Sequence, residues 1–218
     1  MKIKKTEEMN REIIDKMLQQ AAAWVGYCEK GSRDYKCYES KTAGAGRMNW
    51  SRFGRLADIV IFGADRRVKD GYSWCCMFIL AVLYELRAGR QDCTVAAGSM
   101  PVNAEARSWV RDVVAFGAPL TYFAGCQAWF NAYRSKGRVE ASPAPGDFVI
   151  YLTGSGLPYH IGIVEAVGGD GSFTTIEGNT SAAGDEVVPN GGVVARKKRK
   201  KNKNCVFLKN NFLYLRKA

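Results

Sequence analysis

One histidine and one cysteine are the side chains of this 218-residue sequence best suited to nucleophilic chemistry. His160 is the only histidine, and imidazole is the side chain whose ordinary pKa allows proton transfer near neutral pH. Cys75 opens a strongly apolar stretch that is bracketed by Ser73 and Gly89, which predicts a helix with Ser73 as its N-cap. At the second position of that helix, free backbone N–H groups and the helix dipole would favour the Cys75 thiolate. A thiolate with an imidazole to move its protons predicts a reactive nucleophile and a proton carrier.

Each of these residues also has a purely structural interpretation. Free cysteine is among the most buried residue types, and a single histidine often has a structural or surface role. Cys76 would point about 100° around the helix from Cys75, which favours a packing role for its side chain. The chain has no signal peptide by the criterion below, so we expect its seven cysteines to be reduced.

A predicted β-hairpin places polar groups beside His160. Residues 160–167 and 172–177 have the composition of strands, and the Gly-Gly-Asp-Gly segment at 168–171 predicts a tight turn between them. A symmetric turn pairs 167 with 172, so Asn179 lies opposite His160 and Glu177 lies opposite Gly162. All four then share one face, and the carboxylate and amide can hold the imidazole in one orientation. A slip of one residue would move every one of them to the other face.

The predicted elements change character along the chain. Helices are expected at 7–25, 73–86, 104–114 and 127–133, and residues 27–54 are expected to form a loop. Strands are expected at 146–151, 160–167, 172–177, 193–194, 205–208 and 212–215. Helices followed by an antiparallel sheet predict an α+β fold.

Four separate motifs occur in an order that resembles one known family. They are Gly71-Tyr-Ser-Trp-Cys75-Cys-Met-Phe78, Pro145-Gly-Asp-Phe-Val-Ile-Tyr151, His160-Ile-Gly-Ile-Val-Glu165 and Thr175-Ile-Glu-Gly-Asn-Thr-Ser181. With them, the chain resembles the CHAP amidase/peptidase family of the NlpC/P60 papain-like group over most of residues 20–181. The resemblance implies a papain-like α+β fold, with N-terminal helices packed on a central antiparallel sheet, in a single domain spanning residues 1–218.

The resemblance also implies a role for each polar residue. Cys75 would be the nucleophile, His160 the general base and then acid, and Glu177 the residue that orients the imidazole. Asn179 would steady His160 or help to bind the oxyanion. Cys76 takes a place often filled by Ala or Asp in the family, which leaves open which thiol is used, although the adjacent Trp74 favours Cys75.

Substrate and cofactor expectations follow from the same resemblance. Family members cut peptidoglycan, either between N-acetylmuramic acid and L-alanine or within the peptide stem and cross-bridge, and they need no metal. The sequence has no C-x-x-C pair and one histidine, so no zinc site is predicted. Trp74, Trp129 and Tyr133 are candidates for lining a glycan groove, with burial in the core as the alternative.

The positive charge lies almost entirely in the C-terminal segment. The formal net charge is +11, yet residues 187–218 hold ten Lys and Arg and no acidic residue. The basic run at 196–203 contains no aromatic residue to stack on bases, so a nucleic-acid partner is not predicted. The run is instead predicted to form a solvated basic loop. Attachment to an anionic wall polymer is the functional alternative, through Arg196, Lys197, Lys198, Arg199, Lys200, Lys201 and Lys203.

Targeting signals are absent from the sequence. No apolar run approaches the ~18 residues of a membrane span, and the charged start lacks the apolar stretch of a signal peptide. We therefore expect synthesis in the cytoplasm and action at the cell wall after release. A phage lysin fits this pattern, and an injected antibacterial effector fits it nearly as well. A noncatalytic cell-wall-binding module on the same fold is the alternative from another class, and the combination of Cys75, His160 and Glu177 argues against it.

Overall fold

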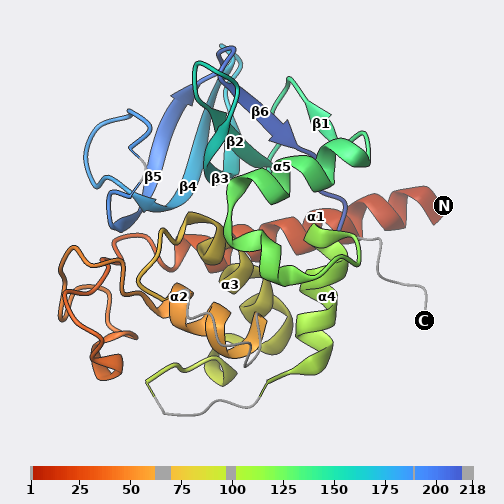
Figure 1. The fold of residues 1–218 in the computed structure, drawn as a ribbon. Helices are drawn as coiled ribbons and strands as arrows, with labels where there is room; N and C mark the ends of the chain where they lie inside the picture. Colours follow the sequence, from red (N-terminus) through yellow and green to blue (C-terminus); the bar gives the residue numbers. More distant parts are fainter. Residues whose placement is uncertain (1, 62–69, 97–101, 189, 213–218) are drawn as a thin grey trace.

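A computed structural model describes residues 2–61, 70–96, 102–188 and 190–212. Among them, five α-helices precede the strands of one six-stranded antiparallel sheet (Figure 1), so the α+β prediction is confirmed. The helices are α1 (Lys2–Ala22), α2 (Arg52–Leu56), α3 (Cys75–Ala88), α4 (Ala104–Ala115) and α5 (Cys126–Ser135). The strands are β1 (Val139–Glu140), β2 (Phe148–Leu152), β3 (Pro158–Val167), β4 (Ser172–Thr180), β5 (Val193–Lys200) and β6 (Cys205–Leu208). Their order across the sheet is β1-β6-β2-β3-β4-β5.

Helix α3 lies at the centre of the helical layer, where it contacts α1, α2 and α4 as well as strands β3 and β4 of the sheet (Figure 1). Its residues from Cys75 to Glu85 are all buried, as expected of a helix that is apolar on every side. It ends at Gly89, whose φ of 91° is one that residues with a side chain rarely adopt. The apolar run thus fixes this helix in the core, and its first residue points toward the sheet side of the molecule.

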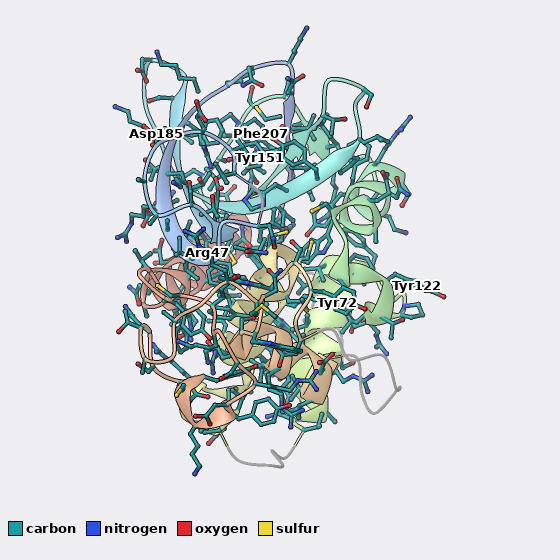
Figure 2. All side chains as sticks on the ribbon, turned by 60° about the vertical axis from the view of Figure 1, so that its left-hand side comes forward. Arg47, Tyr72, Tyr122, Tyr151, Asp185 and Phe207 are labelled. Carbon is teal, nitrogen blue, oxygen red and sulfur yellow. The ribbon has the colours of Figure 1, made fainter. Side chains whose placement is uncertain are left out.

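Both faces of the sheet are covered. On the helix side, alternate residues such as Phe148, Ile161 and Ile176 join the main core. On the other side, a second and smaller apolar cluster forms around Tyr151 and Phe207, which Figure 2 shows close together on the sheet. Polar side chains on this second face are therefore shielded from water.

The hairpin of β3 and β4 has the predicted register only in the half nearer His160. Ile163 pairs with Ile176 and Val164 with Thr175, as expected. Beyond a β-bulge at Glu165, the pairing shifts by one residue, so that Val167 lies opposite Phe173. The turn prediction was wrong because Gly168 donates its N–H to the carbonyl of Ser172, which makes the turn one residue longer on that side.

The basic run forms a strand, so the prediction of a solvated loop was wrong. Residues 196–200 belong to β5, which pairs with β4, and their side chains alternate between exposed and buried. Lys197 and Arg199 are 1% and 4% exposed. Alternation in β5 thus carries two of the basic side chains to the shielded face of the sheet.

Two further sequence expectations concern the last predicted strand and a membrane span. The strand expected at 212–215 lies mostly outside them, and Phe212 is in a turn. None of the helices described combines the length and the apolar character that a membrane crossing requires.

Candidate active site

Cys75 is the first residue of α3. The N-cap is Trp74, and no side chain caps the helix, so the prediction of Ser73 as N-cap was wrong by one residue. The correction leaves Cys75 in the first turn, where backbone N–H groups have no partner within the helix. Its side chain is 4% exposed.

A close approach between α3 and β4 brings this helix start to the sheet. A Cβ atom on Gly178 would lie 2.5 Å from the Cβ of Phe78, so only glycine permits this contact. Gly178 directly follows Glu177, and Phe78 lies one helical turn beyond Cys75. The packing of β4 on α3 therefore sets the spacing between the thiol and the polar groups of the sheet.

His160 lies on the shielded face of the sheet and binds Glu177. Its Nε2 is 3.0 Å from Glu177 Oε2, and both side chains are fully buried. A Cβ atom on Gly162 would lie 2.6 Å from Glu177 Cγ, so the glycine between them leaves the room that the sequence predicted. Nδ1 has no hydrogen-bond partner among the described residues, which leaves that nitrogen for the thiol side of the ring. The ring also stacks on Tyr151, with centroids 5.7 Å apart.

Glu177 is the centre of a buried hydrogen-bond network. Arg199 donates to both carboxylate oxygens, from Nε at 2.9 Å and Nη2 at 2.7 Å. Tyr151 and Thr175 donate their hydroxyls to Oε1 at 2.8 and 2.6 Å. Sequence reasoning placed Arg199 in a basic surface segment and missed this role. The signal that could have shown it is the alternation of side chains along β5, which pairs with the strand that carries Glu177.

The ionisable groups of this network alternate in charge. Burial lowers the pKa of His160, but Cys75 and Glu177 outweigh burial and raise it to about 9. Burial raises the pKa of Glu177, but His160 and Arg199 bring it down to about 2. The pKa of Cys75 is well below the ordinary thiol value, through hydrogen bonds from Cys126 and Cys76 and through His160. The directions of these pKa shifts favour alternating charges along the site, from a thiolate at Cys75 through an imidazolium and a carboxylate to the guanidinium of Arg199.

Comparison with known protein families identifies the family of the chain. Residues 67–179, just over half of the chain, match the CHAP domain family. The chain belongs to the CHAP domain family. Membership supports a peptidoglycan hydrolase, and Cys75, His160 and Glu177 all lie within the matched residues.

Other comparisons add little to the family match. Among curated proteins, none matches the chain. A solved structure of an N-acetylmuramoyl-L-alanine amidase from Staphylococcus aureus is 19% identical, with a TM-score of 0.28, over 39% of this chain and 24% of that one. The chain thus spans about a quarter of that protein. A TM-score this low does not establish a shared fold.

Asn179 of this CHAP domain lies at the helix start and makes its hydrogen bonds away from the imidazole. Its Nδ2 donates to Ser73 Oγ at 3.2 Å and to Asn190 Oδ1 at 3.1 Å, and its Oδ1 accepts from the N–H of Gly192 at 3.1 Å. Its φ of 57° takes it out of the extended strand conformation, so the predicted pairing with His160 does not continue to this residue. Asn179 ties the segment before Cys75 to the loop before β5.

The three aromatic residues predicted to line a glycan groove are in the core, so that prediction was wrong. Trp74, Trp129 and Tyr133 are all 0% exposed. Trp74 donates its indole N–H to Glu29, and Tyr133 its hydroxyl to Asn210. Large aromatic rings with a polar edge satisfied inside the protein offer no surface to a sugar. Exposed rings are found instead at Tyr72 and Tyr122, which Figure 2 labels and which are 64% and 70% exposed.

The candidate wall-polymer residues divide into two groups. Lys197 and Arg199 are buried, with the Lys197 ammonium bound to Ser181 and to two carbonyl groups, so neither can contact a polymer. Arg196 is exposed but pairs with Glu165 at 2.9 Å. The remaining candidates, Lys198, Lys200, Lys201 and Lys203, are exposed.

A hollow of about 670 Å³ lies behind the Glu177–Arg199 pair, and Cys75 and His160 are not among its lining residues. Tyr151, Tyr159 and Arg199 form part of its wall, together with the loop around Asp185. Arg199 also donates to the carbonyl of Asp185, whose place beside the sheet is labelled in Figure 2. The hollow is thus separated from the thiol by the network that supports His160.

Three thiols meet at the start of α3. The Sγ atoms of Cys75, Cys76 and Cys126 all lie within 4.8 Å of one another, and within the described chain these are the residues grouped closely enough to hold a metal ion. The sequence predicted no metal, and a tetrahedral zinc site would need a fourth ligand that this group does not include.

Proposed function

We propose that this CHAP domain hydrolyses an amide bond of bacterial peptidoglycan with Cys75 as nucleophile. The observation that carries the proposal is the buried line of alternating charges from Cys75 through His160 and Glu177 to Arg199. A thiolate, a proton carrier and an orienting carboxylate are the parts that covalent acyl transfer needs, and family membership supplies the substrate class.

In the proposed reaction, the Cys75 thiolate attacks the amide carbonyl carbon and forms a tetrahedral intermediate. Backbone N–H groups in the first turn of α3 are suited to stabilise its oxyanion. The His160 imidazolium gives its proton to the leaving amine, which releases it and leaves an acyl-enzyme. The neutral imidazole then takes a proton from water as the water attacks the thioester. Glu177 acts as a positioning residue that holds the ring through Nε2 and stabilises its positive charge.

Both kinds of amide bond that family members cut are compatible with this chemistry. The proposal therefore covers N-acetylmuramoyl-L-alanine amidase activity and stem or cross-bridge endopeptidase activity. We propose a phage lysin made in the host cytoplasm and acting at the wall after release; an injected antibacterial effector amidase is the alternative role. A noncatalytic wall-binding module would not need the charged Cys75–His160 pair.

The experiment that tests the proposal follows the turbidity of purified cell walls with the intact protein. Loss of turbidity with release of new amino groups is expected, since each amide cleavage exposes one. Mass spectrometry of the fragments separates the bonds, because a cut beside muramic acid frees L-alanine as the new amino terminus. Walls from several species that bind the protein without any new amino groups would favour the binding module.

The ionisation of Cys75 should depend on His160. In a His160→Gln variant, we expect the pKa of Cys75 to rise in part, because the hydrogen bonds with Cys126 and Cys76 still lower it and only the contribution of the imidazolium is lost. The measurement is the pH dependence of iodoacetamide alkylation, with the modified thiol located by tandem mass spectrometry. Arg87→Gln, an exposed site on the same helix, is the control and should keep the wild-type profile. Superimposable profiles for His160→Gln and wild type would show that His160 does not stabilise the Cys75 thiolate.

We also propose that the exposed lysines at the end of β5 bind an anionic wall polymer. Replacing Lys198, Lys200, Lys201 and Lys203 with Gln should weaken wall binding and flatten its dependence on salt, since exposed charges are screened beyond ~8 Å at physiological salt. The measurement is the fraction of protein that sediments with walls at rising salt concentration. A control with the same charge change, at the exposed residues Arg11, Lys16, Lys36 and Lys136, should bind as wild type does. Equal binding by the two quadruple variants would refute a specific lysine patch.

A further inference from the structure

Two helices of this protein begin with a cysteine, and their first residues face each other. Cys75 opens α3 and Cys126 opens α5, with Sγ atoms 3.9 Å apart. Their side chains are 4% and 7% exposed, whereas Cys76 is fully buried. The acyl-transfer mechanism uses Cys75 alone. The second helix start therefore brings to the nucleophile a thiol that the proposed reaction leaves unused.

The distance between the two sulfur atoms suits a covalent link. A disulfide requires about 2.05 Å between sulfurs, so the pair must close by about 2 Å, which side-chain rotation can supply. Cys76 is less suited to bind Cys75, because consecutive helical residues point about 100° apart. Cys76 also lies near Cys126, at 3.5 Å, and is the competing partner that an experiment must distinguish.

The nucleophile is also the thiol of this group most open to oxidation. Peroxides react with thiolates, and the pKa of Cys75 is lowered, first through its hydrogen bond with Cys126, whereas the pKa values of Cys76 and Cys126 are raised. Without a neighbouring thiol, a sulfenic acid at Cys75 would proceed to the irreversible sulfinic acid.

We propose that Cys126 is a resolving cysteine, which converts peroxide-oxidised Cys75 into a Cys75–Cys126 disulfide and so makes oxidative inactivation reversible. In the first step, the Cys75 thiolate attacks hydrogen peroxide, gains an oxygen and releases hydroxide. In the second, the Cys126 sulfur attacks the sulfenic sulfur, and its thiol proton leaves with the departing hydroxyl as water. A thiol reductant returns both cysteines to the reduced state through a mixed disulfide.

The test compares wild type with Cys126→Ser after treatment with hydrogen peroxide, in the presence of a chelator to exclude bound metal. In wild type, we expect a Cys75–Cys126 crosslink in unreduced peptide maps and loss of wall hydrolysis, most of which dithiothreitol restores. In Cys126→Ser, we expect sulfinic acid at Cys75 and little recovery, each value being normalised to the same variant before treatment. Cys93→Ser, at a buried thiol beside Gly89 at the opposite end of α3 from Cys75, is the matched control and should recover as wild type does.

Two results would overturn the inference. One is recovery by Cys126→Ser as complete as that of wild type. The other is a wild-type map in which Cys126 is linked to Cys76, or not linked, while Cys75 is over-oxidised. Recovery of activity rests on the proposed function, whereas the Cys75–Cys126 crosslink is measured by mass alone. A protein that forms the crosslink but does not hydrolyse walls before treatment would therefore support the resolving role of Cys126 and contradict the proposed function. Circular dichroism of the untreated variants shows that each is folded.

Discussion

Cys75→Ala is expected to abolish hydrolysis of cell walls, with a fall of ~10⁴-fold or more, because removal of a covalent nucleophile leaves only substrate binding and oxyanion stabilisation. The fold should survive, since alanine fills most of the volume of a thiol and favours the helix. The measurement is the initial rate of turbidity loss together with amino-group release, at protein concentrations high enough to detect residual activity.

The adjacent cysteine provides the matched control. Cys76→Ala removes the same atom one residue along α3, where the thiol is fully buried and its pKa is raised, first by burial. We expect this variant to keep activity within about tenfold of wild type, with a loss of stability of ~1 kcal/mol from the small cavity. The reverse outcome, an active Cys75→Ala and an inactive Cys76→Ala, would transfer the nucleophile assignment to Cys76.

Glu177→Ala should reduce both stability and activity. The substitution leaves the Arg199 guanidinium buried without its carboxylate, which typically costs about 3–5 kcal/mol of unfolding free energy. It also removes the acceptor at His160 Nε2, so we expect the rate of hydrolysis to fall by ~10²–10⁴-fold. Chemical denaturation and wall hydrolysis on the same preparation measure the two effects.

A double variant separates the structural loss from the chemical one. In Glu177→Ala with Arg199→Met, the guanidinium that would have lost its carboxylate is also removed, so stability should recover substantially while the imidazole still lacks its acceptor. Activity should stay low. Wild-type activity in the double variant would show that Glu177 serves the fold only and does not orient His160.

The stability contributed by Glu177 has a defined pH range. Its folded-state pKa of about 2 lies below the value of ~4.3 for an unfolded chain. The carboxylate therefore contributes its full stabilisation at pH values above the unfolded-state pKa. This contribution is lost as the pH falls toward 2. The difference in unfolding free energy between wild type and Glu177→Gln should therefore shrink between pH 5 and 2, where the glutamine does not titrate.

Several features of the site could be predicted from local sequence because the physics that sets them is local. The apolar run after Trp74 can be stable only as a buried helix, which puts Cys75 at a helix start even though the cap was misplaced by one residue. Alternation in a hairpin places His160 and Glu177 on one face, and the register held next to the site because the bulge at Glu165 absorbs the longer turn. Neither inference needs knowledge of distant contacts.

Other features depended on packing between segments that are far apart in the chain. The choice of core or surface for Trp74 and Trp129 depends on which elements cover them, which composition does not reveal. Cys126 reaches Cys75 only because α5 is packed beside the start of α3, 51 residues away.

The sequence by itself determined the α+β class, a helix with Cys75 in its first turn and a hairpin that joins His160 to Glu177, because periodicity and turn chemistry act between near neighbours. Only the tertiary structure decided the role of the basic run. Both faces of the sheet are covered, so a charged side chain on the second face needs hydrogen-bond partners or a counter-charge there, and Arg199 pairs with Glu177. A segment whose composition predicts a solvated loop thus contributes, at that residue, the buried counter-charge of the carboxylate that binds His160.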